Sequence, residues 1–174
     1  MATRGSILIQ GLAALLIVVL VASGLFYGFG PARIWGHFGP PDLGGVDFAT
    51  LRRRTTPNDA LACRPELCAA RADIESPAFD KRVEDLYLLV PDALAAEPRL
   101  QLVAEDAAQG TLRYVQRSRL LGFPDTINVK IMALPEGRST VLLYSRSQLG
   151  RGDQGVNRAR ITRWMELISS ASLK

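Results

Sequence analysis

An uncharged apolar stretch of 23 residues near the N-terminus, Ile7 to Phe29, constrains this chain more than any other feature. As a helix rising ~1.5 Å per residue, it is long enough to cross the ~30 Å hydrocarbon layer of a bilayer. We therefore expect residues 1–29 to form a transmembrane anchor. A cleaved signal peptide is the alternative, although its apolar region normally spans only ~7 to 15 residues.

The rest of the chain has room for one folded domain. Residues 30–45 are rich in Gly and Pro, which predicts a linker, and residues 46–174 follow as the domain. Residues 47–74 show no clean hydrophobic period, so we expect a mostly irregular arm that packs over the domain.

The two cysteines, Cys63 and Cys68, lie in the short segment C-R-P-E-L-C and can close a small disulfide. Disulfides persist in oxidising compartments. Basic residues flank both ends of the apolar stretch, so the cysteines decide the orientation and predict a single-pass inner-membrane protein with its domain in the periplasm. Two free buried thiols are the alternative. A zinc site needs about four ligands, and the sole histidine, His37, lies beside the apolar stretch, so we expect no metal and no cofactor.

Hydrophobic spacing predicts an α+β domain of two layers. Apolar residues repeat every three or four positions over residues 83–96, and Ile161, Trp164, Met165 and Ile168 form a similar stripe, which predicts two helices. The second helix should start after Gly155, with Asp153 as its cap. Runs rich in Val, Ile and Leu predict a four-stranded antiparallel sheet, with one helix-covered face and one wetter face, and a possible fifth strand at 78–82. The four runs are residues 100–105, 111–119, 125–133 and 139–147.

Polar clusters adjoin these predicted strands in the last third of the chain. They are R-S-R at 117–119, G-F-P-D at 122–125, S-R-S at 145–147 and G-R-G-D-Q-G-V-N-R-A-R at 150–160. We expect the strand ends to point toward the start of the last helix, where Arg117, Arg146 and Arg158 would meet Asp125 and Asp153. The candidate cluster is Arg117, Ser118, Asp125, Ser145, Arg146, Ser147, Asp153, Asn157, Arg158 and Arg160.

These clusters carry a family resemblance. From about residue 47 to 168 the chain resembles a bacterial and plastid family known as a domain of unknown function, with the patterns R-S-x-x-x-G-F-x-D and S-R-S-x-x-G-x-x-D-x-G-x-N-R-x-R-I. The resemblance implies a shared fold and brings no reaction with it. The matching residues are Arg117, Ser118, Gly122, Phe123, Asp125, Ser145, Arg146, Ser147, Gly150, Asp153, Gly155, Asn157, Arg158, Arg160 and Ile161.

The candidate cluster admits two interpretations. Arginine side chains beside a helix N-terminus could bind a carboxylate, a phosphate or a lipid headgroup. Alternatively, Asp125 and Asp153 could pair with those guanidinium groups in a buried structural network. Nucleophilic chemistry at Ser145 or Ser147 lacks a base, because no histidine follows His37. The glycines around Asp153 follow an antiparallel strand, which argues against a dinucleotide loop.

The distribution of charge limits the classes of partner that the domain could bind. Residues 37–109 carry 8 basic and 13 acidic side chains, whereas residues 110–174 carry 11 and 4, so the domain is electrically two-sided. Basic residues show no interleaving with aromatics of the kind that stacks nucleic-acid bases, so we expect no nucleic-acid partner. We expect a non-enzymatic, membrane-anchored domain that binds a membrane or periplasmic protein or supports an envelope complex. Binding of a small anionic ligand or lipid headgroup is the alternative, and an enzyme the third.

Overall fold

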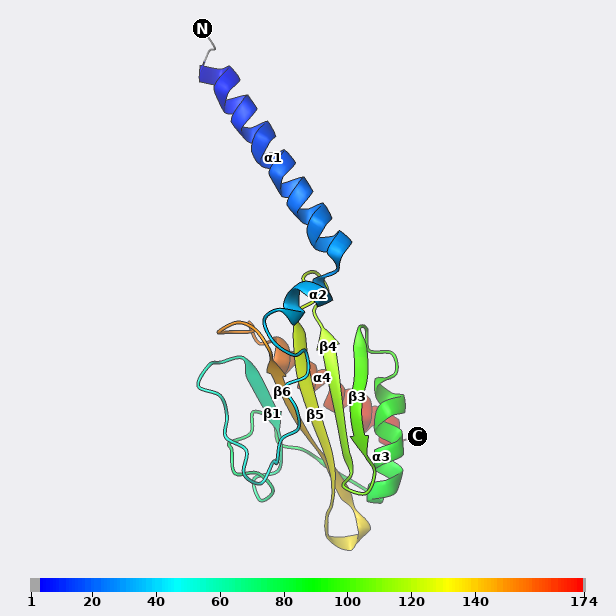
Figure 1. Ribbon diagram of the computed structural model, residues 1–174. Helices are drawn as coiled ribbons and strands as arrows, with labels where there is room; N and C mark the ends of the chain where they lie inside the picture. The colour runs from blue at the N-terminus through cyan, green and yellow to red at the C-terminus, as the bar shows by residue number, and fades with distance from the viewer. Residues whose placement is uncertain (1–3, 174) are drawn as a thin grey trace.

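The computed structural model describes residues 4–173 and shows a long helix attached to an α+β domain (Figure 1). Helix α1 spans Arg4–Phe29, and its side chains make no buried core. Its span of residues 7–29 is long and apolar enough to cross a membrane, as an anchor or as a signal sequence. A six-residue helix, α2 (Pro31–Gly36), turns the chain onto the domain.

The domain contains an antiparallel sheet of six strands. Four are the predicted runs, a fifth lies within the segment predicted at 78–82, and the sixth, residues 59–62, was not predicted. The strand order is β1-β6-β5-β4-β3, and the two-residue strand β2 also pairs with β6. The bounds are β1 Asp59–Ala62, β2 Ala78–Phe79, β3 Leu100–Asp106, β4 Thr111–Arg117, β5 Pro124–Ala133 and β6 Ser139–Ser147. A short 3-10 turn, η1 (Pro135–Gly137), joins β5 to β6.

The arm is mostly irregular, as predicted, except for strand β1, which the sequence did not predict. Residues 59–62 pair in antiparallel register with β6, with Asp59 opposite Arg146 and Ala62 opposite Leu143. The sequence D-A-L-A has little intrinsic strand preference. It is extended because the edge of β6 offers unpaired backbone groups that this segment satisfies.

Two helices cover one face of the sheet, as the hydrophobic spacing predicts. Helix α3 (Val83–Leu94) and helix α4 (Val156–Ser172) lie on the same face of the sheet (Figure 1). Their buried apolar residues pack there on alternate residues of the central strands. Trp164 of α4 is fully buried and meets the ring of Tyr114 edge to face, with centroids 5.7 Å apart. The core on this face also contains Leu86, Val90, Leu94, Ile127, Val129, Ile131, Val141, Leu143, Ile161 and Ile168.

The opposite face is not the wetter surface that the alternation predicts. The arm formed by residues 41–75 lies across it, and Phe48 and Leu51 pack there on Leu142 and Tyr144. Cys63 and Cys68 form a disulfide within this layer, as predicted. The arm supplies a second, smaller core, because apolar side chains on both faces of β6 must be removed from water.

Candidate functional site

Strand β6 divides the predicted polar cluster between the two faces of the sheet. Ser145 and Ser147 are buried on the helix-covered face, and Arg146 lies between them on the arm-covered face. Successive side chains of a strand point to opposite faces, so the S-R-S motif cannot bring all three side chains to one place. The polar residues therefore form separate groups.

The first group is a buried network centred on Arg160. Its guanidinium pairs with Asp125 at 2.6 Å, and the two side chains are only 6% and 7% exposed. The other guanidinium nitrogens donate to Gln116 at 2.6 Å, to Ser145 at 2.8 Å and to Asn157 at 2.6 Å. All three nitrogens of Arg160 therefore have partners, as a buried cation requires. We call these five residues the buried network.

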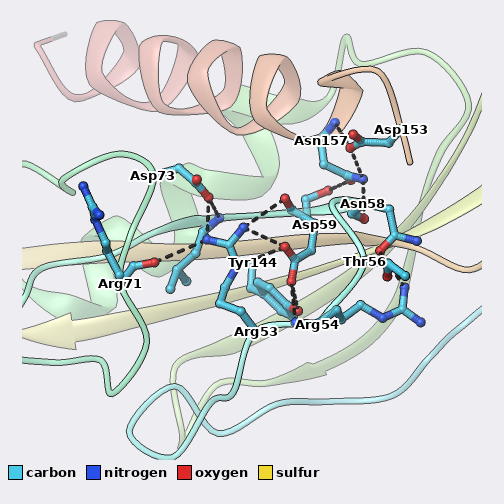
Figure 2. Close-up of polar contacts among 12 residues, drawn as sticks. Arg53, Arg54, Thr56, Asn58, Asp59, Arg71, Asp73, Tyr144, Asp153 and Asn157 are labelled. Carbon is cyan, nitrogen blue, oxygen red and sulfur yellow. Dashed lines mark hydrogen bonds and ion pairs between the residues drawn. The ribbon is translucent and has the colours of Figure 1, made fainter. Parts of the chain in front are cut away.

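Asn157 extends this network to the start of α4. Its amide nitrogen lies 2.7 Å from the Asp153 carboxylate, 2.9 Å from the Ser147 hydroxyl and 3.1 Å from the backbone oxygen of Asn58 (Figure 2). Asp153 also accepts from the backbone N–H groups of Gly155 and Asn157. The N-cap residue itself is Gly155, so Asp153, the predicted cap, binds the start of α4 from two positions earlier. The start of α4 is thus fastened to the ends of β1 and β6.

Arg146 does not join the carboxylates, which corrects the predicted convergence. Its guanidinium donates instead to the backbone oxygens of Leu43 and Gly44, at 2.8 and 2.9 Å. Burial lowers the pKa of Arg146, because the charged form loses solvation. The bonds tie the end of the predicted linker to the sheet.

Arg117 and Arg158 also lie apart from Asp125 and Asp153. Arg117 donates to the backbone oxygen of Gly122, and the nearby Ser118 hydroxyl accepts from the N–H of Phe123, so both shape the loop between β4 and β5. Arg158 is exposed and reaches the backbone oxygen of Asp73 at 3.5 Å. On a helix, residues two positions apart face opposite ways, so Arg160 rather than Arg158 faces the sheet.

The sequence did not predict a second ionic group, which forms where the arm meets Tyr144 of β6. Arg53 bridges two carboxylates, Asp59 at 2.6 Å and Asp73 at 2.7 Å, and the hydroxyl of Tyr144 donates to Asp59 at 2.6 Å (Figure 2). Burial acts to raise the pKa of Asp59, but hydrogen bonds from Arg53 and Tyr144 outweigh it, so that pKa is lowered. Burial and this carboxylate raise the pKa of Tyr144.

A pocket of about 520 Å³ opens beside this ionic group. Four arginines from three parts of the chain line it, namely Arg53, Arg54, Arg71 and Arg158, together with the carboxylates of Asp59 and Asp73. We call it the arginine pocket. Four positive and two negative side chains leave an excess of positive charge.

The four arginines are not equally engaged. Arg53 is committed to its two carboxylates, and Arg54 donates to Asn58 and to the backbone oxygen of Ser147. Arg71 is exposed, and within residues 4–173 its guanidinium makes no hydrogen bond, while Arg158 makes one long contact. Donors on these two side chains remain available. The sequence signal that could have drawn attention here is the run R-R-R at 52–54.

Comparison with known proteins identifies a family and little else. Residues 54–168 match the family described as "Protein of unknown function (DUF1499)". No curated protein is significantly similar in sequence. Among solved structures, the crystal structure of Ara h 8.0201 matches with a TM-score of 0.42 and 14% identity, over 57% of this chain and 94% of that one.

Proposed function

The chain belongs to the DUF1499 family, whose role is unknown, so we propose a function from the geometry: a membrane-anchored, extracytoplasmic domain that binds a small anionic group in the arginine pocket. The observation that carries the proposal is that Arg71 and Arg158 are among the residues that line the pocket and have donors still available. Phosphate and carboxylate groups are the natural partners of such guanidinium pairs.

Binding suits this domain better than catalysis. Asp125 and Asp153, which could otherwise serve as an acid and a base, already accept hydrogen bonds inside the protein. Ser145 is buried and bonded to Asn157 and Arg160, where no substrate can reach its hydroxyl. A nucleophile needs an adjacent base and access to the reacting atom. The buried network supports the structural interpretation of the polar motifs.

The ion pairs at the floor of the pocket favour a preformed site. Arg53 is held by Asp59 and Asp73 before any ligand arrives, so the pocket keeps its shape without binding. The mixed charge limits affinity, because Asp59 and Asp73 repel an anion that approaches too deeply. We expect the anion to bind at the rim, between Arg71 and Arg158.

The disulfide supports an extracytoplasmic location. Cys63 and Cys68 are both oxidised, which suits the periplasm rather than the reducing cytoplasm. An uncleaved α1 would then hold the domain at the outer surface of the inner membrane as a single-pass anchor. Binding of a partner protein stays a prediction, because the surfaces described above give no reason to prefer a protein over an anionic ligand.

Thermal unfolding of the full-length protein in detergent tests the anion site. Inorganic phosphate and citrate should each raise the melting temperature above that in sodium chloride of matched ionic strength, because a ligand that binds only the folded state stabilises it. The variants Arg71→Gln and Arg158→Gln should lose this increase while they stay folded. Arg52→Gln is the matched control, because Arg52 is exposed, adjacent in sequence and absent from the pocket lining.

Two outcomes would contradict the proposal. One is the absence of any anion-specific stabilisation of the wild-type protein over chloride. The other is an equal loss of stabilisation in Arg52→Gln, because that would reflect overall charge and not a pocket.

A further inference from the structure

The loop between β4 and β5, residues 118–123, lies against the C-terminal end of α1 (Figure 1). The hydroxyl of Tyr27 in α1 donates to the backbone oxygen of Leu120 at 3.1 Å. The indole N–H of Trp35 in α2 donates to the backbone oxygen of Leu121 at 2.5 Å. The domain is therefore joined to the end of α1 by contacts as well as by the chain.

Two further contacts hold the loop against α2. The rings of Trp35 and Phe123 lie 4.4 Å apart. Gly122 has φ +67°, and a Cβ there would lie 2.9 Å from the Cβ of Pro31. Only glycine permits both this backbone conformation and the close approach of α2. The geometry of the β4–β5 loop and that of α2 are thus interdependent.

The contact with Tyr27 sets the depth of the loop. The apolar span ends at Phe29, so Tyr27 lies within the last turn of the part that crosses the membrane. Tyr and Trp side chains concentrate where the headgroups meet the hydrocarbon. Because the Leu120 backbone lies within a hydrogen bond of Tyr27, it must lie at about the same level.

The outward side of the loop has the chemistry of a membrane surface. The side chain of Leu120 is 71% exposed and that of Leu121 is 44% exposed, although the domain has two cores that could bury such residues. Arg119, which precedes them, is also exposed and forms no ion pair among residues 4–173. Exposed leucines flanked by basic residues are typical of segments that lie in the interface of a bilayer.

We propose that the β4–β5 loop is a second membrane contact, in which Leu120 and Leu121 insert into the outer leaflet and Arg119 lies among the phosphate groups. This rests on the anchored form of the proposed function. The domain then stands on two supports, α1 and the loop, and cannot rotate freely about the end of α1. Its arginine pocket would keep a fixed orientation toward the bilayer.

A site-specific fluorophore tests this in the full-length protein in phospholipid vesicles. Cys63 and Cys68 are disulfide-bonded, so Leu120→Cys provides the one reactive thiol for an environment-sensitive dye. Lipids that carry a nitroxide near the headgroup should quench this dye strongly, and lipids with a deep nitroxide should quench it less. Leu88→Cys is the control, because Leu88 is 69% exposed on α3 and away from the loop, so its dye should stay unquenched. Leu16→Cys, inside the apolar span, reports on α1.

The three labels separate the possible failures. Quenching at positions 16 and 120 but not at 88 supports the loop contact. Quenching at 16 alone overturns the loop contact and leaves the anchor intact. No quenching at 16, or loss of α1 by cleavage, overturns both the anchor and the inference that depends on it.

Discussion

Replacement of Arg160 by Met should be among the most destabilising single substitutions in this domain. Methionine keeps the length of the apolar stem but removes the charge, which leaves the Asp125 carboxylate buried at 7% exposure without its cation. Loss of one partner from a buried ion pair costs ~3–5 kcal/mol. Ser145 and Asn157 lose a donor in the same change.

The expected loss is a large part of the total free energy of unfolding. Domains of this size unfold with a free energy of about 5–15 kcal/mol, so Arg160→Met should remove a substantial fraction of it. At roughly 3–4 °C per kcal/mol, the melting temperature should fall by about 10–20 °C. Urea titration of the full chain in detergent measures the change, followed by tryptophan fluorescence in a Trp35→Phe background so that the buried Trp164 gives the signal.

Two further variants make the reasoning refutable. Arg82→Met breaks a surface pair with Asp85, whose side chains are 71% and 51% exposed, and should leave the urea midpoint almost unchanged because water screens the pair. The double variant Asp125→Leu with Arg160→Met removes both buried charges and should recover most of the loss. If Arg160→Met proved no more harmful than Arg82→Met, the buried network would not stabilise the domain.

Three other changes should have measurable effects. Folding lowers the pKa of Asp59, so the ionised carboxylate contributes stability above its unfolded pKa of ~3.9 and loses that contribution as the pH falls through the folded pKa. In urea titrations from pH 5 downward, the unfolding free energy should therefore fall with pH, and Asp59→Asn should reduce that fall. Reduction of the Cys63–Cys68 bond should lower the unfolding free energy by about 2 kcal/mol, a modest loss because the closed loop is short. Thiol labelling before and after reductant checks that the bond is intact, and labelling of the unreduced protein would contradict the disulfide. Gly110→Ala should destabilise by over ~1 kcal/mol in the same titration, because φ is +64° and the new Cβ would meet the backbone oxygen of Ile131 at 2.9 Å; an unchanged midpoint would exclude this strain.

The sequence predicted an element correctly where the spacing of its apolar residues was enough to identify its buried face. Ile127, Val129 and Ile131 alternate cleanly, and the structure places all three in the main core. The predicted start of α4 after Gly155 is confirmed, and the Asp153 carboxylate accepts from the N–H of Asn157 in its first turn, although the N-cap residue is Gly155. Local chemistry and local periodicity sufficed for these elements.

The pairing of Arg160 was missed although its signal was present. Arg160 lies four residues before Trp164, and Asn157 lies four before Ile161, so both extend the buried stripe of α4. The helical period therefore places Arg160, and not Arg158, against the sheet. Arg146 was misassigned for the corresponding reason on a strand, since its neighbours Ser145 and Ser147 already occupy the helix-covered face.

The arginine pocket could not be predicted from local patterns. Arg53 and Arg71 come from the arm and Arg158 from α4, and their proximity depends on β1 adding to the edge of β6. Strand β1 has four residues, of which two are alanine, so its pairing is decided by the available edge rather than by its own preference.

The long hairpin of β5 and β6 runs from the α1 end of the domain to η1 at the opposite end (Figure 1). Ten residues at ~3.4 Å each make β5 about 34 Å long. In the anchored protein, η1 would therefore stand some three to four nanometres above the lipid, out of reach of short membrane-embedded neighbours. Molecules that contact this tip must approach from the aqueous space, whereas those that contact the β4–β5 loop can diffuse in the plane of the bilayer.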